Sequence, residues 1–175
     1  MTDSAGTELT SSQFHAMGYF INKYAKIEGG ISVYFAWLMQ IPLHEAKIIL
    51  APYTARDYRA VLKGIEKLRD SHPEHREKWA QLLGDLGGFS KLRNAIAHDY
   101  WTRGSREGAI KPIGISTRGN HPEFYGIGEK ERDYTDDELQ GECEKLDALH
   151  GRFLEFYEAV GASDYIARLI RESSG

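Results

Sequence analysis

The sequence has little of several features that would point to a particular class of protein. Cys143 is its only cysteine, so no disulfide can form within the chain, and a zinc site built from a cysteine cluster is excluded. No uninterrupted apolar run approaches the roughly 18 residues that a membrane span requires. The first residues also lack the basic start and apolar run of a secretory signal. We therefore expect a cytoplasmic protein with no membrane association.

A strong excess of positive charge is also absent. The formal net charge is -4, which argues against a broad electrostatic surface for duplex nucleic acid. The charges are uneven, however, and only Asp99 and Glu107 oppose a basic group formed by Lys91, Arg93, Arg103, Arg106, Lys111 and Arg118. A small local anion site is compatible with this pattern, and a solvated loop fits it equally well.

The composition that is present is typical of a globular domain. At 175 residues, with 41% hydrophobic and 27% charged residues, the chain has the size of one domain. Residues 1–13 are polar and show no periodic apolar face, so we expect a disordered N-terminal tail there. Residues 14–175 are expected to form a single helical domain.

Apolar periodicity predicts an all-α fold of four to five helices arranged as a bundle. The predicted helices cover residues 14–39, 43–50, 55–69, 74–100 and 135–160. The fourth places Tyr100 at the end of its apolar stripe. Gly29 and Gly30 interrupt the first, which we expect where another backbone comes close.

The last long helix is preceded by an insertion and begins with a capping signal. Residues 102–134 are rich in glycine, and short strands at 108–115 and 124–128 predict a small β-hairpin or ordered loop. Thr135 and Glu138 have the spacing of a capping box, which favours a helix start at this point.

One segment contains several side chains that could take part in catalysis or binding: Arg93-Asn94-Ala95-Ile96-Ala97-His98-Asp99-Tyr100. On a helix, Asn94 and His98 lie four residues apart and face the same way, with Arg93 on the adjacent flank. The two alanines keep the surroundings small, which would let a second helix or a substrate backbone approach.

This segment resembles the signature of the HEPN superfamily. Residues 93–98 match its pattern of an arginine, a polar residue, three variable positions and a histidine. Tyr100 extends the match to the Arg-x4-His-x-Tyr form of HepT-type toxins. The resemblance is concentrated between Leu92 and Trp101, and it extends in architecture over about residues 14–160. The insertion departs from a minimal HepT-like bundle, so the subfamily stays open.

The resemblance implies a metal-independent endoribonuclease of the toxin or defence type, without a cofactor, in which two protomers form a homodimer around one RNA cleft. The residue types suit that reaction. Because the ordinary pKa of a histidine side chain is about 6.5, His98 can act as general acid and base at neutral pH. Arg93 can stabilise negative charge on the phosphate, and Asn94 can orient His98 or the phosphate. Arg103 and Arg106 are further predicted phosphate contacts.

Two other functions fit the same residues. The cleft could belong to a non-catalytic helical module that binds a nucleotide or a protein partner. Tyr100 fits a core or stacking role, and in HepT-like systems the matching tyrosine is modified with AMP by a partner nucleotidyltransferase, which serves as the antitoxin.

Glu28 is a second unusual residue. It occupies a position on the apolar seam of the first helix that periodicity assigns to leucine. Because an unpaired buried carboxylate is costly, we expect it to pair with Arg93 or with the Asn94 and His98 group, within a protomer or across the dimer. Alternatively, the helix is rotated so that Glu28 lies in water.

Overall fold

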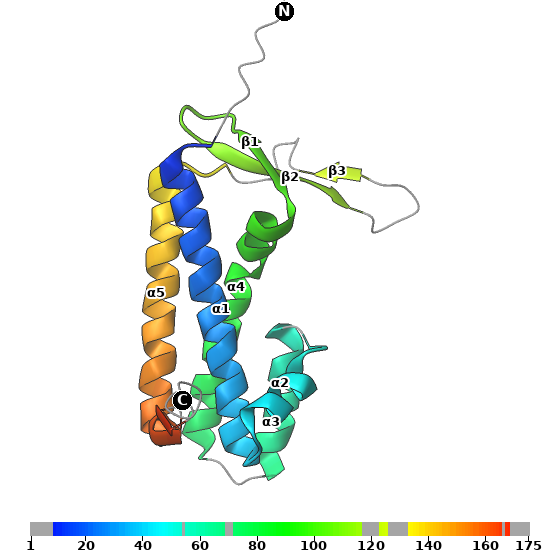
Figure 1. The fold of residues 1–175 in the computed structure, drawn as a ribbon, viewed down its shortest axis with the longest axis vertical. Helices are drawn as coiled ribbons and strands as arrows, with labels where there is room; N and C mark the ends of the chain where they lie inside the picture. The colour runs from blue at the N-terminus through cyan, green and yellow to red at the C-terminus, as the bar shows by residue number, and fades with distance from the viewer. Residues whose placement is uncertain are drawn as a thin grey trace, which may run out of the picture. The chain divides into compact units, whose positions relative to one another are not determined.

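The chain is mostly helical and carries one small antiparallel sheet (Figure 1). The computed structural model describes residues 9–53, 55–68, 72–116, 123–125, 133–165 and 167–168. The elements in chain order are α1 (Ser11–Met39), α2 (Leu43–Leu50), α3 (Ala55–Leu68), α4 (Pro73–His98), β1 (Tyr100–Arg103), β2 (Ile110–Ser116), β3 (Glu123–Tyr125) and α5 (Asp136–Ala159). The predicted helical class is confirmed, as is a sheet before the last long helix. Among the residues that the structure describes, no helix has the length and apolar character needed to cross a membrane.

The chain divides into two compact units. The first contains Met1–Asn22 and Ser90–Lys145, and the second contains Lys23–Phe89 and Leu146–Gly175. Each division point falls inside a long helix, so α1, α4 and α5 contribute residues to both units.

In the first unit, α1 begins within the predicted tail, which corrects the tail's boundary. The helix starts at Ser11 because Thr10 and Gln13 form a capping box. The Gln13 amide donates to Thr10 Oγ1 at 3.2 Å, and the Thr10 amide donates to Gln13 Oε1 at 2.9 Å. Gln13 is buried, and its Nε2 donates to Asp136 Oδ1 at 2.8 Å. Residues 1–8 of the predicted tail lie outside the described residues.

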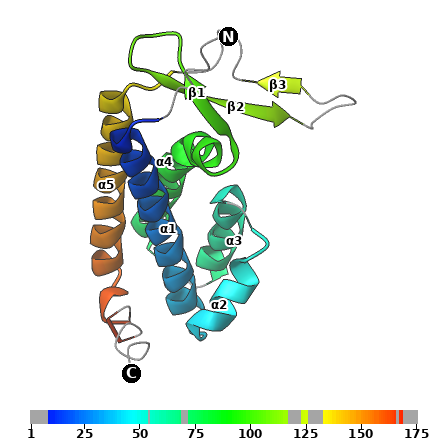
Figure 2. The same ribbon diagram turned by 45° about the horizontal axis from the view of Figure 1, so that its top comes forward.

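The sheet also belongs to the first unit, and β2 lies between β1 and β3 (Figure 2). Both pairings are antiparallel. The prediction of two short strands is confirmed for β2 and β3, although the predicted residues 126–128 lie outside the described part. β1 was not predicted as a strand. Its first residue, Tyr100, was predicted as the last residue of the fourth helix.

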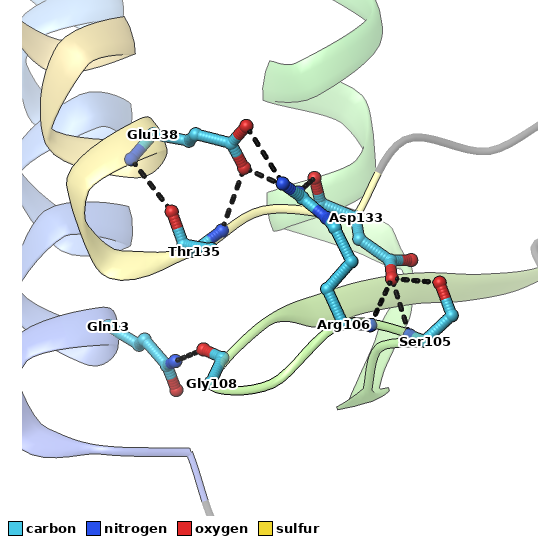
Figure 3. Close-up of polar contacts among 7 residues, drawn as sticks. All are labelled: Gln13, Ser105, Arg106, Gly108, Asp133, Thr135 and Glu138. Carbon is cyan, nitrogen blue, oxygen red and sulfur yellow. Dashed lines mark hydrogen bonds and ion pairs between the residues drawn. The ribbon is translucent and has the colours of Figure 1, made fainter.

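The start of α5 follows the predicted capping box. The Glu138 amide donates to Thr135 Oγ1 at 3.3 Å, and the Thr135 amide donates to Glu138 Oε2 at 3.0 Å (Figure 3). Further along the helix, the buried Cys143 thiol donates to the Ala16 carbonyl oxygen at 3.4 Å. The lone cysteine is therefore a packed core residue of the first unit.

Aromatic side chains fill the core of the second unit. The Tyr34 ring lies 4.3 Å from the Trp79 ring and 5.3 Å from the Phe156 ring, measured between centroids. Gly30 accommodates the same cluster, because a Cβ atom there would lie only 2.9 Å from the Tyr157 hydroxyl oxygen. Gly30 therefore makes room for a side chain. The sequence predicts instead the close approach of another backbone. A Cβ at Gly29 would meet no atom within 4 Å.

Candidate functional site

The predicted motif occupies the last turns of α4, within the first unit. Asn94 and His98 are exposed, and Arg93 is half-buried. Because Asn94 and His98 are separated by four residues in continuous helix, they lie on one face, as the spacing predicts. Both side chains are therefore open to solvent in the single chain.

Arg93 and Asn94 are linked directly. The Arg93 Nη1 donates to Asn94 Oδ1 at 3.1 Å. This bond uses the acceptor end of the amide, so the NH2 group of Asn94 remains as a donor. Within the residues that the structure describes, the His98 side chain makes no hydrogen bond. The imidazole is therefore accessible without the loss of an internal hydrogen bond.

The end of α4 is fixed by one carbonyl oxygen. Ala95 O accepts from the Asp99 amide at 3.0 Å and from the Trp101 indole Nε1 at 3.1 Å. Carbonyls in the last turn of a helix lack helical partners, so these bonds satisfy a group that would otherwise be unpaired. Trp101 is buried, and its indole holds the first residues of β1 against the helix end.

This helix end overturns the predicted position of Tyr100. The sequence predicts a helix through residue 100, with Tyr100 on the apolar stripe, whereas α4 ends at His98 and Tyr100 begins β1. The side chain of Tyr100 is 74% exposed. Burial of Trp101 at the next position explains the change, because alternate residues of a strand face opposite sides.

The two predicted phosphate contacts beyond the motif have different surroundings. Arg103 is exposed at the end of β1. Arg106, in contrast, donates from Nη1 and Nη2 to the Glu138 carboxylate at 3.2 and 2.6 Å, and from Nη2 to the Asp133 carbonyl oxygen at 2.5 Å (Figure 3). Its guanidinium therefore joins the β1–β2 loop to the start of α5, and we leave it out of the proposed phosphate contacts.

Asp133 anchors the same loop and was not among the residues predicted from sequence. Its Oδ2 accepts from the Ser105 hydroxyl at 2.6 Å, from the Ser105 amide, and from the Arg106 amide at 3.2 Å (Figure 3). Burial alone would raise the pKa of Asp133, but the Ser105 and Arg106 hydrogen bonds and the charge of Lys111 together lower it. Its only sequence signal was its place just before the capping box, in an acidic stretch that resembles a solvated surface.

Glu28 lies in the second unit, whereas the motif lies in the first. It is half-buried on α1, and its backbone carbonyl oxygen accepts from the Ser32 hydroxyl at 3.3 Å. The predicted pairing of its carboxylate with Arg93 or with the Asn94 and His98 group stays a prediction.

Neither a metal site among the described residues nor a known relative identifies the function. In the described ranges, no group of three or more His, Cys, Asp or Glu side chains is placed to hold a metal ion. Comparison with known proteins gives no match, either to a family model, to a curated protein or to a solved structure. The function therefore has to be inferred from the motif and its surroundings.

Proposed function

We propose that this protein is a HEPN-like, metal-independent endoribonuclease of the toxin or defence type. In this proposal its helices form the HEPN bundle, and two copies share one RNA cleft in the cytoplasm. The observation that carries the proposal is the exposure of Asn94 and His98 on one face of α4, beside the half-buried Arg93. A general acid and base must reach the proton that it transfers, and a histidine enclosed in the core could not do so.

The proposed reaction needs only groups that this motif supplies. His98 takes the proton from a ribose 2′-hydroxyl, and the 2′-oxygen then attacks the adjacent phosphorus. The bond from phosphorus to the 5′-oxygen breaks, and the histidine returns a proton to that oxygen. The products are a 2′,3′-cyclic phosphate and a 5′-hydroxyl. Arg93 stabilises the negative charge that develops on the phosphoryl oxygens.

The hydrogen bond between Arg93 and Asn94 favours one of the two roles considered for Asn94. Because its Oδ1 accepts from Arg93, the amide supports the guanidinium and presents its NH2 group as a second donor. We therefore assign Asn94 to phosphate binding and not to orientation of His98.

Cleavage of RNA in the presence of EDTA tests this proposal. Purified protein is incubated with structured RNA beside His98→Ala, Arg93→Lys and the matched control His44→Ala, which alters an exposed helical histidine of the second unit. We expect cleavage by the wild type and the control, and none by His98→Ala. Arg93→Lys should cleave more slowly, because lysine keeps the charge but loses the paired donors.

The outcomes separate the enzyme from a binding module. Cleavage that survives in His98→Ala would contradict the assignment of the general base. RNA binding by the wild type without cleavage would favour the non-catalytic helical module. Products carrying a 3′-hydroxyl would contradict attack by the 2′-oxygen.

A second candidate function is supported by the exposure of Tyr100. A side chain that is 74% exposed is accessible to a nucleotidyltransferase, as AMP transfer requires. The phenol oxygen would attack the α-phosphorus of ATP, lose its proton and release pyrophosphate. Mass spectrometry after coexpression with a neighbouring nucleotidyltransferase tests this, with Tyr100→Phe as the control.

A further inference from the structure

The two faces of the β1–β2 ladder have opposite characters. The register pairs Trp101 with Pro112 and Arg103 with Ile110 on one face, and Tyr100 with Ile113 and Thr102 with Lys111 on the other. The first face is mostly shielded from solvent, since three of its four residues are buried: Trp101, Ile110 and Pro112. The second has no buried residue, and Tyr100 is its most exposed member. We call this second set, Tyr100, Thr102, Lys111 and Ile113, the outer sheet face.

Tyr100 and Lys111 are diagonal neighbours on this face. Tyr100 lies opposite Ile113, and Lys111 is two residues before Ile113 in β2. Diagonal neighbours in an antiparallel pair are about 7 to 8 Å apart, within reach of long and aromatic side chains. An exposed aromatic ring and an ammonium group therefore share one small surface. This combination is the one that binds single strands, in which bases stack on aromatic rings and phosphates contact basic groups.

The outer sheet face directly follows the proposed catalytic residue. Tyr100 comes two residues after His98, so their Cα atoms are at most about 7 Å apart. The path between them is fixed, because the Trp101 indole and the Asp99 amide both donate to Ala95 O. An RNA strand that reaches His98 can therefore also reach Tyr100.

We propose that the outer sheet face binds single-stranded RNA, with a base stacked on Tyr100 and a neighbouring phosphate in contact with Lys111. This inference rests on the proposed function for its link to cleavage at His98. It commits to a single strand because the bases of a duplex are stacked on one another and offer no free face to a side chain. The insertion thus contributes Lys111 to a substrate subsite beside the motif.

The charges around the face limit the electrostatic part of binding. Lys111 lies close enough to Asp133 to lower the pKa of that carboxyl, so its own charge is partly offset. We therefore expect stacking to carry most of the affinity. The dependence on salt should be shallow, with a logarithmic slope of about -0.7 for each phosphate contact.

Binding of an uncleavable strand tests this subsite separately from catalysis. A fluorescently labelled 2′-O-methyl RNA single strand is titrated with the full chain, and its anisotropy is measured. The methyl group blocks attack by the 2′-oxygen, so the wild-type protein can be used. Tyr100→Ala should weaken binding about tenfold or more, and Tyr100→Phe should retain it, because phenylalanine keeps the ring. Lys111→Gln should weaken binding less and reduce the salt slope.

A matched control removes another exposed aromatic side chain. Phe14 is 62% exposed on α1, and Phe14→Ala should bind as the wild type does. Equal binding by Tyr100→Ala and the wild type would overturn the proposal, as would an absence of binding by the wild type or tighter binding of a duplex of the same sequence. A melting temperature of Tyr100→Ala equal to that of the wild type shows that a loss of binding in this variant is not a folding defect.

Failure of this inference can be told apart from failure of the proposed function. If unmodified RNA is cleaved but Tyr100→Ala binds the blocked strand normally, the nuclease stands and the subsite is wrong. If the blocked strand binds through Tyr100 but no RNA is cleaved, the subsite stands and the nuclease is wrong.

Discussion

Replacing Asp133 with alanine should destabilise the first unit, because one carboxylate oxygen accepts three hydrogen bonds from the loop after β1. The donors are the hydroxyl and amide of Ser105 and the amide of Arg106. Hydrogen bonds to a charged group contribute about 1.5 to 3 kcal/mol each. The freed donors lie in an exposed loop and regain water, so we expect a total loss of about 3 kcal/mol and not the full sum.

Packing around the carboxylate supports a loss of this size. A Cβ atom at Gly104 would lie 2.7 Å from Asp133 Oδ2, so loop and carboxylate are in close contact. Asp133→Asn keeps one oxygen acceptor and loses the charge, and we expect it to lose roughly half as much. For a chain of this length, about 3 kcal/mol corresponds to a fall in melting temperature of about 6 to 12 °C.

Two assays check the prediction. Urea denaturation followed by tryptophan fluorescence measures the free energy of unfolding, and hydrogen exchange reports on the amides of Ser105 and Arg106. The pKa of Asp133 is lowered in the folded chain, so its contribution is present above about pH 4 and is lost as the pH falls through the folded pKa. Asp133→Asn should lack this part of the acid dependence. Unchanged stability in Asp133→Ala, with equally slow exchange at both amides, would refute the reasoning.

Two further predictions concern the second unit. Gly30→Ala should lower the free energy of unfolding by about 1 to 2 kcal/mol, because the new methyl group collides with the buried Tyr157 ring and this outweighs the gain in helix propensity. The loss should shrink in a Tyr157→Phe background, which removes the nearest atom, and additive effects of the two changes in urea denaturation would contradict the contact. Burial, followed by the charge of Lys23, lowers the pKa of His150 in the folded chain. The contribution of His150 to stability is therefore present above about pH 6.5, and it is lost as the pH falls from that value through the lower folded pKa. Denaturation curves for the wild type and His150→Gln at pH 7.5 and at pH 5.5, roughly one unit either side of that value, should show a smaller pH effect in the variant, and equal effects would exclude this role.

Local signals in the sequence determined the helices and the placement of the motif. The apolar period predicted α2 with its observed bounds, and the spacing of Thr135 and Glu138 predicted the cap of α5. The separation of Asn94 and His98 likewise put both side chains on one helix face. These features depend on interactions within a few residues, so the sequence contains all the information they need.

The tertiary structure decided how far each helix extends and which polar groups are engaged. α4 ends at His98, and not at Tyr100, because burial of Trp101 and its bond to Ala95 O draw the following residues into the sheet. Arg106 pairs with Glu138, a residue 32 positions away in the chain. Such contacts join residues that no local period or spacing connects. Burial and long-range hydrogen bonds together distinguish a structural carboxylate such as Asp133 from a solvated one. The exposure of His98 and Tyr100, on which the proposed chemistry depends, is a property of the same kind.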